Sequence, residues 1–223
     1  MPRFLVLGGT GPVGIAVIRR AIPMYPSSTI VVYVRSPEKL PPDIINHPHV
    51  TIVEGQLHDR NALHAAMEGV DVVISALGPS VKKGPFHPAD TPLAKGYAVV
   101  IEVMKERNVP RLICLGTASI TDPNDKHNVA FSLLVAGVAT FAKNAYKDMV
   151  AIGETVRTEG AELEWTIVRV PVLTDKDNSA FFAGYVGDGK TSTFLSRKGF
   201  AAFVLEEVSK REWVRMAPLI STK

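Results

Sequence analysis

The sequence has a single cysteine, Cys114, among its 223 residues. One thiol cannot build an intrachain disulfide framework, and it cannot provide a cysteine-based zinc site. The N-terminal segment has one arginine and then a short apolar run that ends at glycines, so it lacks the apolar region and cleavage site of a secretory signal peptide. We therefore expect a cytoplasmic protein without structural disulfides.

Neither charge nor hydrophobicity is concentrated in a way that indicates nucleic-acid binding or a membrane span. The 25 Lys and Arg residues against 22 Asp and Glu residues give a net charge of +3, with no basic tail or stripe. The longest apolar stretch, residues 129–142, falls short of the roughly 18 residues that span a bilayer, and it lacks the basic polar face of a surface-binding helix. The six histidines show neither an HExxH motif nor clustered ligand spacing, so no metal site is predicted.

Apolar runs of strand length alternate with segments of helical spacing along the whole chain. The predicted strands are residues 3–8, 29–34, 50–53, 70–76, 111–115 and 165–170. The predicted helices are residues 12–22, 60–68, 91–107, one long or two abutting helices within 128–159, and a late helix at 201–208.

This alternation predicts a doubly wound parallel sheet with helices on both faces, a three-layer α/β/α architecture. We expect one domain over residues 1–223, because 223 residues are few for two domains and no linker is found. Ligands of such sheets bind beyond the carboxyl ends of the strands. The substrate side is therefore expected in the segments 79–90, 118–145 and 172–195.

The loop after the first strand, residues 8–14, reads GGTGPVG. It satisfies two glycine spacings typical of dinucleotide-binding loops, G-x-G-x-x-G and G-x-x-G-x-x-G. Glycines permit a tight turn and close approach to a pyrophosphate, which then faces the positive end of the following helix. The motif stands between the first strand and the first helix, which favours a cofactor site over a purely structural turn.

The end of the second strand indicates which dinucleotide is bound. NAD-binding proteins carry an Asp or Glu there for the ribose 2′-hydroxyl, whereas this chain reads Tyr33-Val34-Arg35-Ser36. The guanidinium of Arg35 can fork onto a phosphate, so NADP (NADPH) is favoured over NAD. The alternative is an ordinary solvated loop arginine.

Seven motifs together resemble one protein superfamily. They are GGTGPVG, VRSPEKL, VEGQLHD, ISALGP, LGTAS, WTIVRVPVLTD and TFLSRKGFAAFVLEEV. The chain resembles the atypical short-chain dehydrogenase/reductase superfamily over essentially its whole length. It is most similar to the NAD(P)H-binding branch of flavin reductase/biliverdin reductase B and the NmrA-like proteins, which have the NAD(P)-binding Rossmann fold.

The resemblance implies a set of cofactor-binding residues. The pyrophosphate would be held by Gly8, Thr10, Gly11, Pro12, Val13 and Gly14, and the adenosine phosphate by Arg35 and Ser36. Gln56 and Leu57 would flank the adenine, Ala76, Leu77 and Gly78 the ribose, and Pro171, Val172, Leu173 and Thr174 the nicotinamide amide. The chain departs from the family at Gln56, where Asp is common, at Val170, where a second Pro is frequent, and at Gly199, where the family has Asp.

The resemblance also places hydroxyl groups near the nicotinamide. Thr117 and Ser119 follow the fifth strand, where the superfamily has a hydroxyl beside the substrate carbonyl; capping of a turn is their ordinary alternative role. Tyr146 matches the tyrosine of the Y-x-x-x-K motif, but position 150 is Val instead of Lys. Lys143 lies one helical turn before Tyr146 and is the residue that could replace the missing lysine, unless it is only a solvated charge.

The apolar run 129–142 precedes Tyr146 directly. It predicts either a wall of a pocket for a small hydrophobic or aromatic substrate, or a subunit interface, or a plain core helix. A monomer and a homodimer fit the sequence equally well.

Together these features predict an NADPH-dependent reductase that transfers hydride to a hydrophobic carbonyl, quinone or flavin-like acceptor. Two other functions stay open on the same scaffold. One is a redox-silent, NmrA-like regulatory protein that binds NADP, which the missing lysine at position 150 favours. The other is a non-redox isomerase or cyclase of specialised metabolism.

Overall fold

The computed structural model describes residues 1–79 and 86–223. Its centre is a mostly parallel sheet of eight strands in the order β3-β2-β1-β4-β5-β6-β10-β8. The six strands predicted from the sequence are all present and form the first six positions of that order, which confirms the doubly wound sheet. They are β1 (Phe4–Leu7), β2 (Ile30–Val34), β3 (Val50–Glu54), β4 (Val72–Ser75), β5 (Arg111–Thr117) and β6 (Glu164–Val170).

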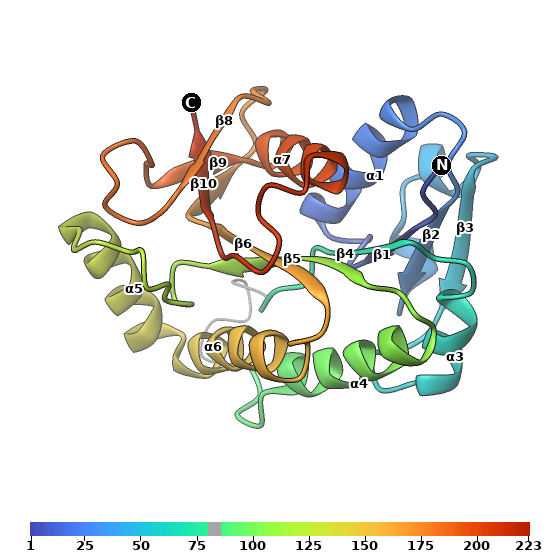
Figure 1. Ribbon diagram of the computed structural model, residues 1–223, viewed down its shortest axis with the longest axis horizontal. Helices are drawn as coiled ribbons and strands as arrows, with labels where there is room; N and C mark the ends of the chain where they lie inside the picture. The colour runs from blue at the N-terminus through green and yellow to red at the C-terminus, as the bar shows by residue number, and fades with distance from the viewer. Residues whose placement is uncertain (80–85) are drawn as a thin grey trace.

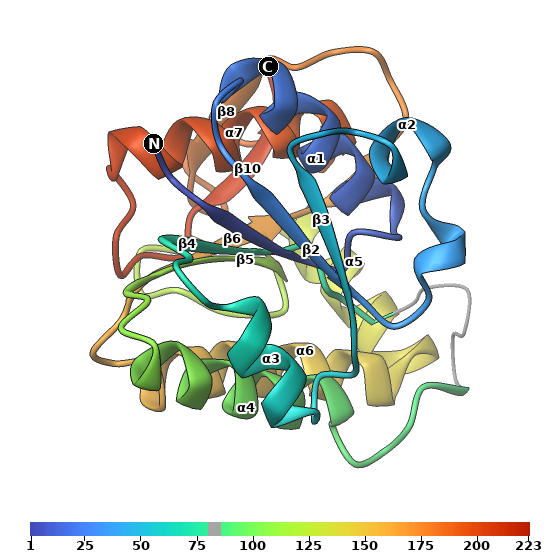
Figure 2. The same ribbon diagram turned by 90° about the vertical axis from the view of Figure 1, so that its right-hand side faces the viewer.

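Helices cover both faces of the sheet, as Figures 1 and 2 show. On one face lie α1 (Pro12–Met24) and α7 (Arg197–Lys210), and on the other lie α3 (Arg60–Ala66), α4 (Pro92–Glu106) and α6 (Lys143–Thr158). The strands between them are buried apolar runs; every residue of β1, β2 and β4 is buried. The α/β/α layering is therefore confirmed, and the core is the sheet itself.

Several short elements escape the sequence prediction. They are the 3-10 helix η1 (Pro37–Lys39), α2 (Pro42–Ile45), β7 (Val172–Thr174), β8 (Phe181–Gly184), β9 (Phe194–Ser196) and β10 (Leu219–Thr222). Strands of three or four residues carry too little periodicity to be recognised. They are defined by distant partners instead: β10 pairs in parallel with β6 and antiparallel with β8, and β7 pairs with β9.

The last helix begins earlier than predicted. Residues 201–208 were expected, but α7 starts at Arg197. Its start is set by Ser196, whose side chain accepts a hydrogen bond from the backbone N–H of Gly199 at 2.8 Å. A serine in this position satisfies one of the free N–H groups of the first helical turn.

The segment 128–159 forms two helices, α5 (Val129–Phe141) and α6. Their axes differ by 116°. The interpretation of residues 129–142 as a core helix is wrong, because Phe131 is the only buried residue of α5. In the part of the chain that the structure describes, no single helix has the length and apolar character to cross a membrane; α5 and α6 meet that standard only as a bent pair.

A buried ion pair joins the loops beyond β5 and β6. The side chain of Arg169 on β6 is fully buried, and its guanidinium makes two bonds to the Asp125 carboxylate, at 2.6 and 2.8 Å. It also donates to the carbonyls of Ile120 and Ala217, while Asp125 accepts a further bond from the N–H of Val186. The pair thus fixes the backbone of three segments near the carboxyl end of β6.

We predict that Asp125→Ala lowers the free energy of unfolding by about 3 kcal/mol, because it leaves the buried guanidinium of Arg169 without its counter-charge. Asp177→Ala, which breaks the exposed pair with Lys198, is the control and should cost less than about 1 kcal/mol. Urea denaturation of both variants provides the measurement. Equal losses in the two variants would contradict the role assigned to the buried pair.

The same pair produces a pH dependence. Burial alone would raise the pKa of Asp125, but the hydrogen bonds and charge of Arg169 outweigh burial and hold the pKa below its ordinary value. A depressed pKa contributes stability that is present above the unfolded-state value and is lost as pH falls through the folded-state value. The stability difference between the wild type and Asp125→Ala should therefore shrink below about pH 4.

Candidate functional site

The glycine loop after β1 has no room for a side chain at three of its glycines. Gly8 has a φ of +76°, and a Cβ there would lie 3.1 Å from the backbone of Ala76 and Leu77 in the loop after β4. A Cβ on Gly9 would lie 2.6 Å from Cγ1 of Val32, and one on Gly14 would collide with the carbonyl oxygen of Gly8. The loop is therefore a cradle of bare backbone, which fits the close approach of a pyrophosphate.

The N-terminus of α1 opens from this cradle. Gly11 is its N-cap residue, with no side-chain cap, and its backbone N–H donates to the Gly8 carbonyl at 3.1 Å. Pro12 occupies the first turn, which contains no acidic residue. The free N–H groups of a first turn carry partial positive charge. The residues present thus fit an anionic group at this point.

The predicted adenosine side is held by a buried tyrosine. The Tyr33 hydroxyl on β2 donates to the carbonyl of Gln56 at 2.8 Å. Burial, together with the charge of Asp59, raises the pKa of Tyr33 to about 12, so it stays a donor at all ordinary pH values. Gly55 carries no side chain at the point where a Cβ would collide with the Tyr33 ring. Arg35 follows β2 directly, is exposed, and makes no ion pair with the described residues.

The predicted ribose segment, residues 76–78, is held in place by contacts with α4 and β5. Ser75 at the end of β4 and Tyr97 of α4 are buried and share a hydrogen bond of 2.6 Å between their hydroxyls. The Ser75 oxygen also accepts from the N–H of Leu77 at 3.4 Å. A Cβ on Gly78 would lie 3.3 Å from Leu115. The segment is therefore packed against both α4 and β5.

Thr117 ends β5 beside the predicted nicotinamide segment. The strand register pairs Thr117 with Val170, the residue before Pro171. The Thr117 side chain accepts a hydrogen bond from the N–H of Ser119 at 3.3 Å, and Ser119 is buried. The turn-capping role considered for Thr117 is thus present, and it occupies the oxygen as an acceptor while leaving the hydroxyl proton free to donate.

The predicted catalytic residues of α6 are not joined to one another. Tyr146 is half-buried, and its hydroxyl makes no hydrogen bond to any described residue. Lys143 is exposed and makes no ion pair or hydrogen bond with the described residues, and Val150 is 36% exposed. The structure gives no contact through which Lys143 would replace the missing lysine.

A buried histidine–aspartate pair beside these residues was missed. His87 Nε2 lies 2.7 Å from Oδ2 of Asp148, which is fully buried on α6. The same carboxylate accepts the N–H groups of Leu93 and Ala94 at 3.1 and 3.0 Å and so caps α4 from outside. The sequence gives no local signal for this pair: Thr91 stands before α4 as a capping residue would, but it has a φ of 51° and does not cap the helix, so the Asp148 carboxylate satisfies the free N–H groups instead.

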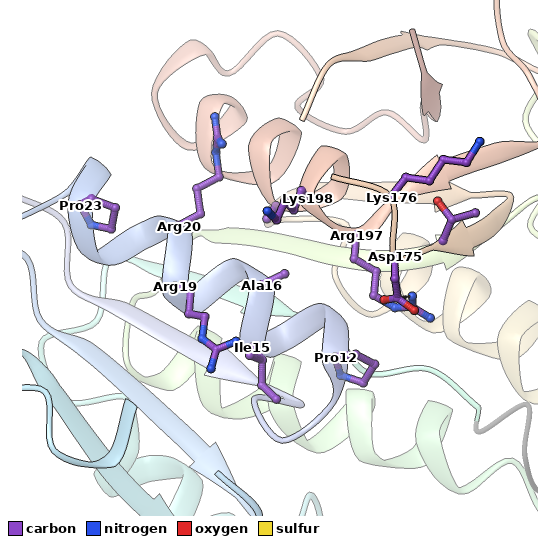
Figure 3. A pocket seen from close by; sticks show the side chains of 12 residues that line it. Pro12, Ile15, Ala16, Arg19, Arg20, Pro23, Asp175, Lys176, Arg197 and Lys198 are labelled. Carbon is purple, nitrogen blue, oxygen red and sulfur yellow. Dashed lines mark hydrogen bonds and ion pairs between the residues drawn. The ribbon is translucent and has the colours of Figure 1, made fainter. Parts of the chain in front are cut away.

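The predicted nicotinamide segment borders a groove between α1 and α7. Pro171 is buried, residues 172–174 form β7, and the Thr174 hydroxyl donates to the Leu195 carbonyl at 3.4 Å. The groove has a volume of about 570 Å³, and Pro12 and Thr174 are among the residues that line it. Figure 3 shows it from close by, with Pro12, Asp175 and Arg197 labelled. Its charged lining residues are Arg19, Arg20, Asp175, Lys176, Arg197 and Lys198. Positive charge thus predominates next to the glycine cradle.

A comparison with models of protein families assigns the chain to a family. A model of the NAD(P)H-binding family matches residues 8–211, which include every predicted cofactor residue. The chain belongs to the NAD(P)H-binding family. No curated protein matches the sequence significantly. Within the described residues, no group of three or more His, Cys, Asp or Glu side chains could hold a metal ion.

Solved structures of this family type have the same fold. A short-chain dehydrogenase/reductase (ethylated) from Veillonella parvula is 17% identical, with a TM-score of 0.81 over 100% of this chain and 95% of that one. A wide-type short-chain dehydrogenase/reductase from the same organism, in complex with NADP, is 16% identical, with a TM-score of 0.78 over 99% and 95%.

ChuY, an anaerobillin reductase from Escherichia coli O157:H7, is 15% identical, with a TM-score of 0.76 over 98% of this chain and 96% of that one. The NAD(P)H-binding family and the Rossmann-type fold that the resemblance implied are confirmed. At these identities the likeness shows the fold and leaves the substrate open.

We predict that Gly14→Ala weakens dinucleotide binding at least about tenfold, or about 1.4 kcal/mol, because the added methyl group forces the α1 N-terminus away from Gly8. Gly137→Ala on α5 is a matched control: a Cβ there meets nothing within 4 Å. It should leave binding unchanged and raise stability by about 0.5–1 kcal/mol. Calorimetric titration and urea denaturation test both variants; undiminished binding by Gly14→Ala would exclude the cradle as the cofactor site.

Proposed function

We propose that this protein is an NADPH-dependent reductase that acts on a hydrophobic carbonyl, quinone or flavin-like acceptor. The observation that carries the proposal is the glycine cradle at the positive end of α1, with Thr117 paired with Val170, the residue before the predicted nicotinamide segment. When bound there, the cofactor supplies the hydride. The chain's own residues position the reactants and donate hydrogen bonds.

Arg35 supports the choice of NADPH. It is an exposed guanidinium at the end of β2, it has no carboxylate partner among the described residues, and Ser36 beside it has a side chain that caps nothing. Both side chains are therefore available to a 2′-phosphate. An NAD-type site would need a carboxylate here, and the sequence has none between Val34 and Pro37.

We predict that Arg35→Ala weakens NADPH binding about tenfold or more, because one charge-assisted hydrogen-bonding group is lost, and leaves NADH binding unchanged. Lys105→Ala, which removes an exposed cation at the C-terminal end of α4, serves as the control. Fluorescence titration with each dinucleotide measures the ratio. A preference that stays the same in Arg35→Ala would rule out this assignment.

Hydroxyl groups at the end of β5 and on α6 are proposed to face the acceptor. Thr117 keeps its proton free to donate, and Tyr146 has no protein partner within the described residues. Ser119 is buried behind Thr117 and shapes the turn. In this arrangement Thr117 hydrogen-bonds the acceptor oxygen, which stabilises the negative charge that develops there, and Tyr146 is a second donor. The structure gives Lys143 no contact with either.

We predict that Thr117→Val lowers kcat by about tenfold to a hundredfold, because the donor to the developing oxyanion is lost. Thr117→Ser should retain most of the activity. Steady-state kinetics with a quinone acceptor measures both variants, with cofactor affinity determined in parallel. Full turnover by Thr117→Val would reduce Thr117 to a turn cap, and full turnover by Tyr146→Phe would remove Tyr146 from the mechanism.

Two alternatives are distinguished by one experiment. The unpartnered Tyr146 and Val150 at the lysine position favour a redox-silent NADP-binding regulator, and the same scaffold could serve a non-redox isomerase or cyclase. NADPH absorbance is followed during incubation with an acceptor panel, and products are analysed. Consumption supports the reductase, product without consumption supports the isomerase, and tight binding with neither supports the regulator.

The proposed site is built within one domain, residues 1–223, in the cytoplasm. Its substrate side comprises the segments 79–90, 118–145 and 172–195, of which residues 80–85 lie outside the described residues. His87 lies in the first of these segments and is tied to α6 by Asp148, and the Asn144 side chain donates to the His87 carbonyl at 2.9 Å. These contacts hold the described end of that segment against α6.

A further inference from the structure

Helix α5 is apolar on every side but packs against protein on only one. Phe131 anchors it in a small cluster with Val186 and Leu219. By contrast, Val129 is 64%, Leu133 70% and Phe141 79% exposed. Figure 1 shows α5 projecting at one end of the molecule, beyond α6. Exposed apolar surface of this kind marks an interaction site.

The exposed side chains form a stripe that faces away from the protein. Val129, Leu133, Ala136 and Thr140 are all exposed and follow one another at intervals of four, three and four residues. At 3.6 residues per turn they share one face of the helix, opposite Phe131. The stripe therefore points into solvent, and a substrate bound between α5 and the sheet would not cover it.

Lysines stand at both ends of this stripe without acidic neighbours. Lys126 and His127 precede α5, Lys143 and Lys147 follow it, and all four are exposed. Residues 126–147 contain no Asp or Glu. The basic groups lie at the ends of the helix and not along its polar face, which is why the sequence pattern alone did not indicate surface binding.

The two carboxylates that flank residues 126–147 already have partners within the protein. Asp125 is held by the buried Arg169, and Asp148 is fully buried against His87 and the start of α4. Neither can neutralise the lysines. A second copy of the chain on the same face would bring the same cations together with no carboxylate to pair them, so self-association is disfavoured and an anionic surface is favoured.

We propose that α5 docks this protein on an anionic lipid bilayer. The stripe and Phe141 enter the boundary between headgroups and acyl chains, while the lysines at both ends extend to the lipid phosphates. The helix lies in the plane of the membrane surface and does not cross it. This inference is independent of the proposed reductase activity, since it involves neither the cofactor nor an acceptor.

The test is co-sedimentation with vesicles, carried out without NADPH. Wild-type protein should partition onto equimolar phosphatidylcholine and phosphatidylglycerol vesicles about tenfold or more better than onto pure phosphatidylcholine, and high salt should remove the difference. Leu133→Glu should lower partitioning about tenfold by placing a charge in the apolar stripe. The double variant Lys126→Glu and Lys147→Glu should lower binding to the level of pure phosphatidylcholine.

Two controls match these variants. Ile45→Glu changes another exposed apolar side chain, on α2, and Lys39→Glu reverses another exposed lysine, on η1; both should bind as the wild type does. Circular dichroism confirms that each variant is folded. The proposal is overturned by absent or equal partitioning onto the two vesicle types, or by an equal loss in the controls. A dimer in light scattering that Leu133→Glu dissociates would instead assign the face to a second copy.

Discussion

The close approach of α1 to the sheet is the constraint on which the rest of the molecule depends. Gly9 and Gly14 leave no room for a methyl group between the glycine loop, β2 and the first helical turn. Because the helix can come this near, its N-terminus stands at the carboxyl ends of β1 and β4, where the strand order reverses. The same glycines are thus needed both for the packing of α1 against the sheet and for the anion-binding geometry of its N-terminus.

The central sheet could be predicted because buried parallel strands are continuous apolar runs. Residues of β2 and β4 are buried on both faces, so their hydrophobicity is visible in the sequence whatever surrounds them. The strands β7 to β10 are different. Their pairing depends on segments far away in the chain, such as Leu219 beside Arg169. The sequence of a short strand does not indicate which distant strand it pairs with.

The candidate site likewise has one part that could be predicted from the sequence and one part that could not. A glycine fingerprint is local, so the cradle at residues 8–14 could be identified from spacing alone. The His87–Asp148 pair joins positions 61 residues apart, and neither residue has neighbours that mark it. The placement of α5 likewise depends on the bend after Phe141, which excludes the core helix that was one of three interpretations of residues 129–142. An apolar sequence predicts a helix whose side chains are removed from water, but only the tertiary structure determines which surface covers them.

Asp148 has one further consequence. Its carboxylate holds the start of α4, and α4 carries Tyr97, which in turn bonds Ser75 at the edge of the ribose segment. A single chain of contacts therefore runs from α6 to the loop after β4, which is the proposed ribose segment. If α6 shifts, the start of α4 must shift with it or lose two hydrogen bonds to a buried carboxylate, and Tyr97 moves with α4.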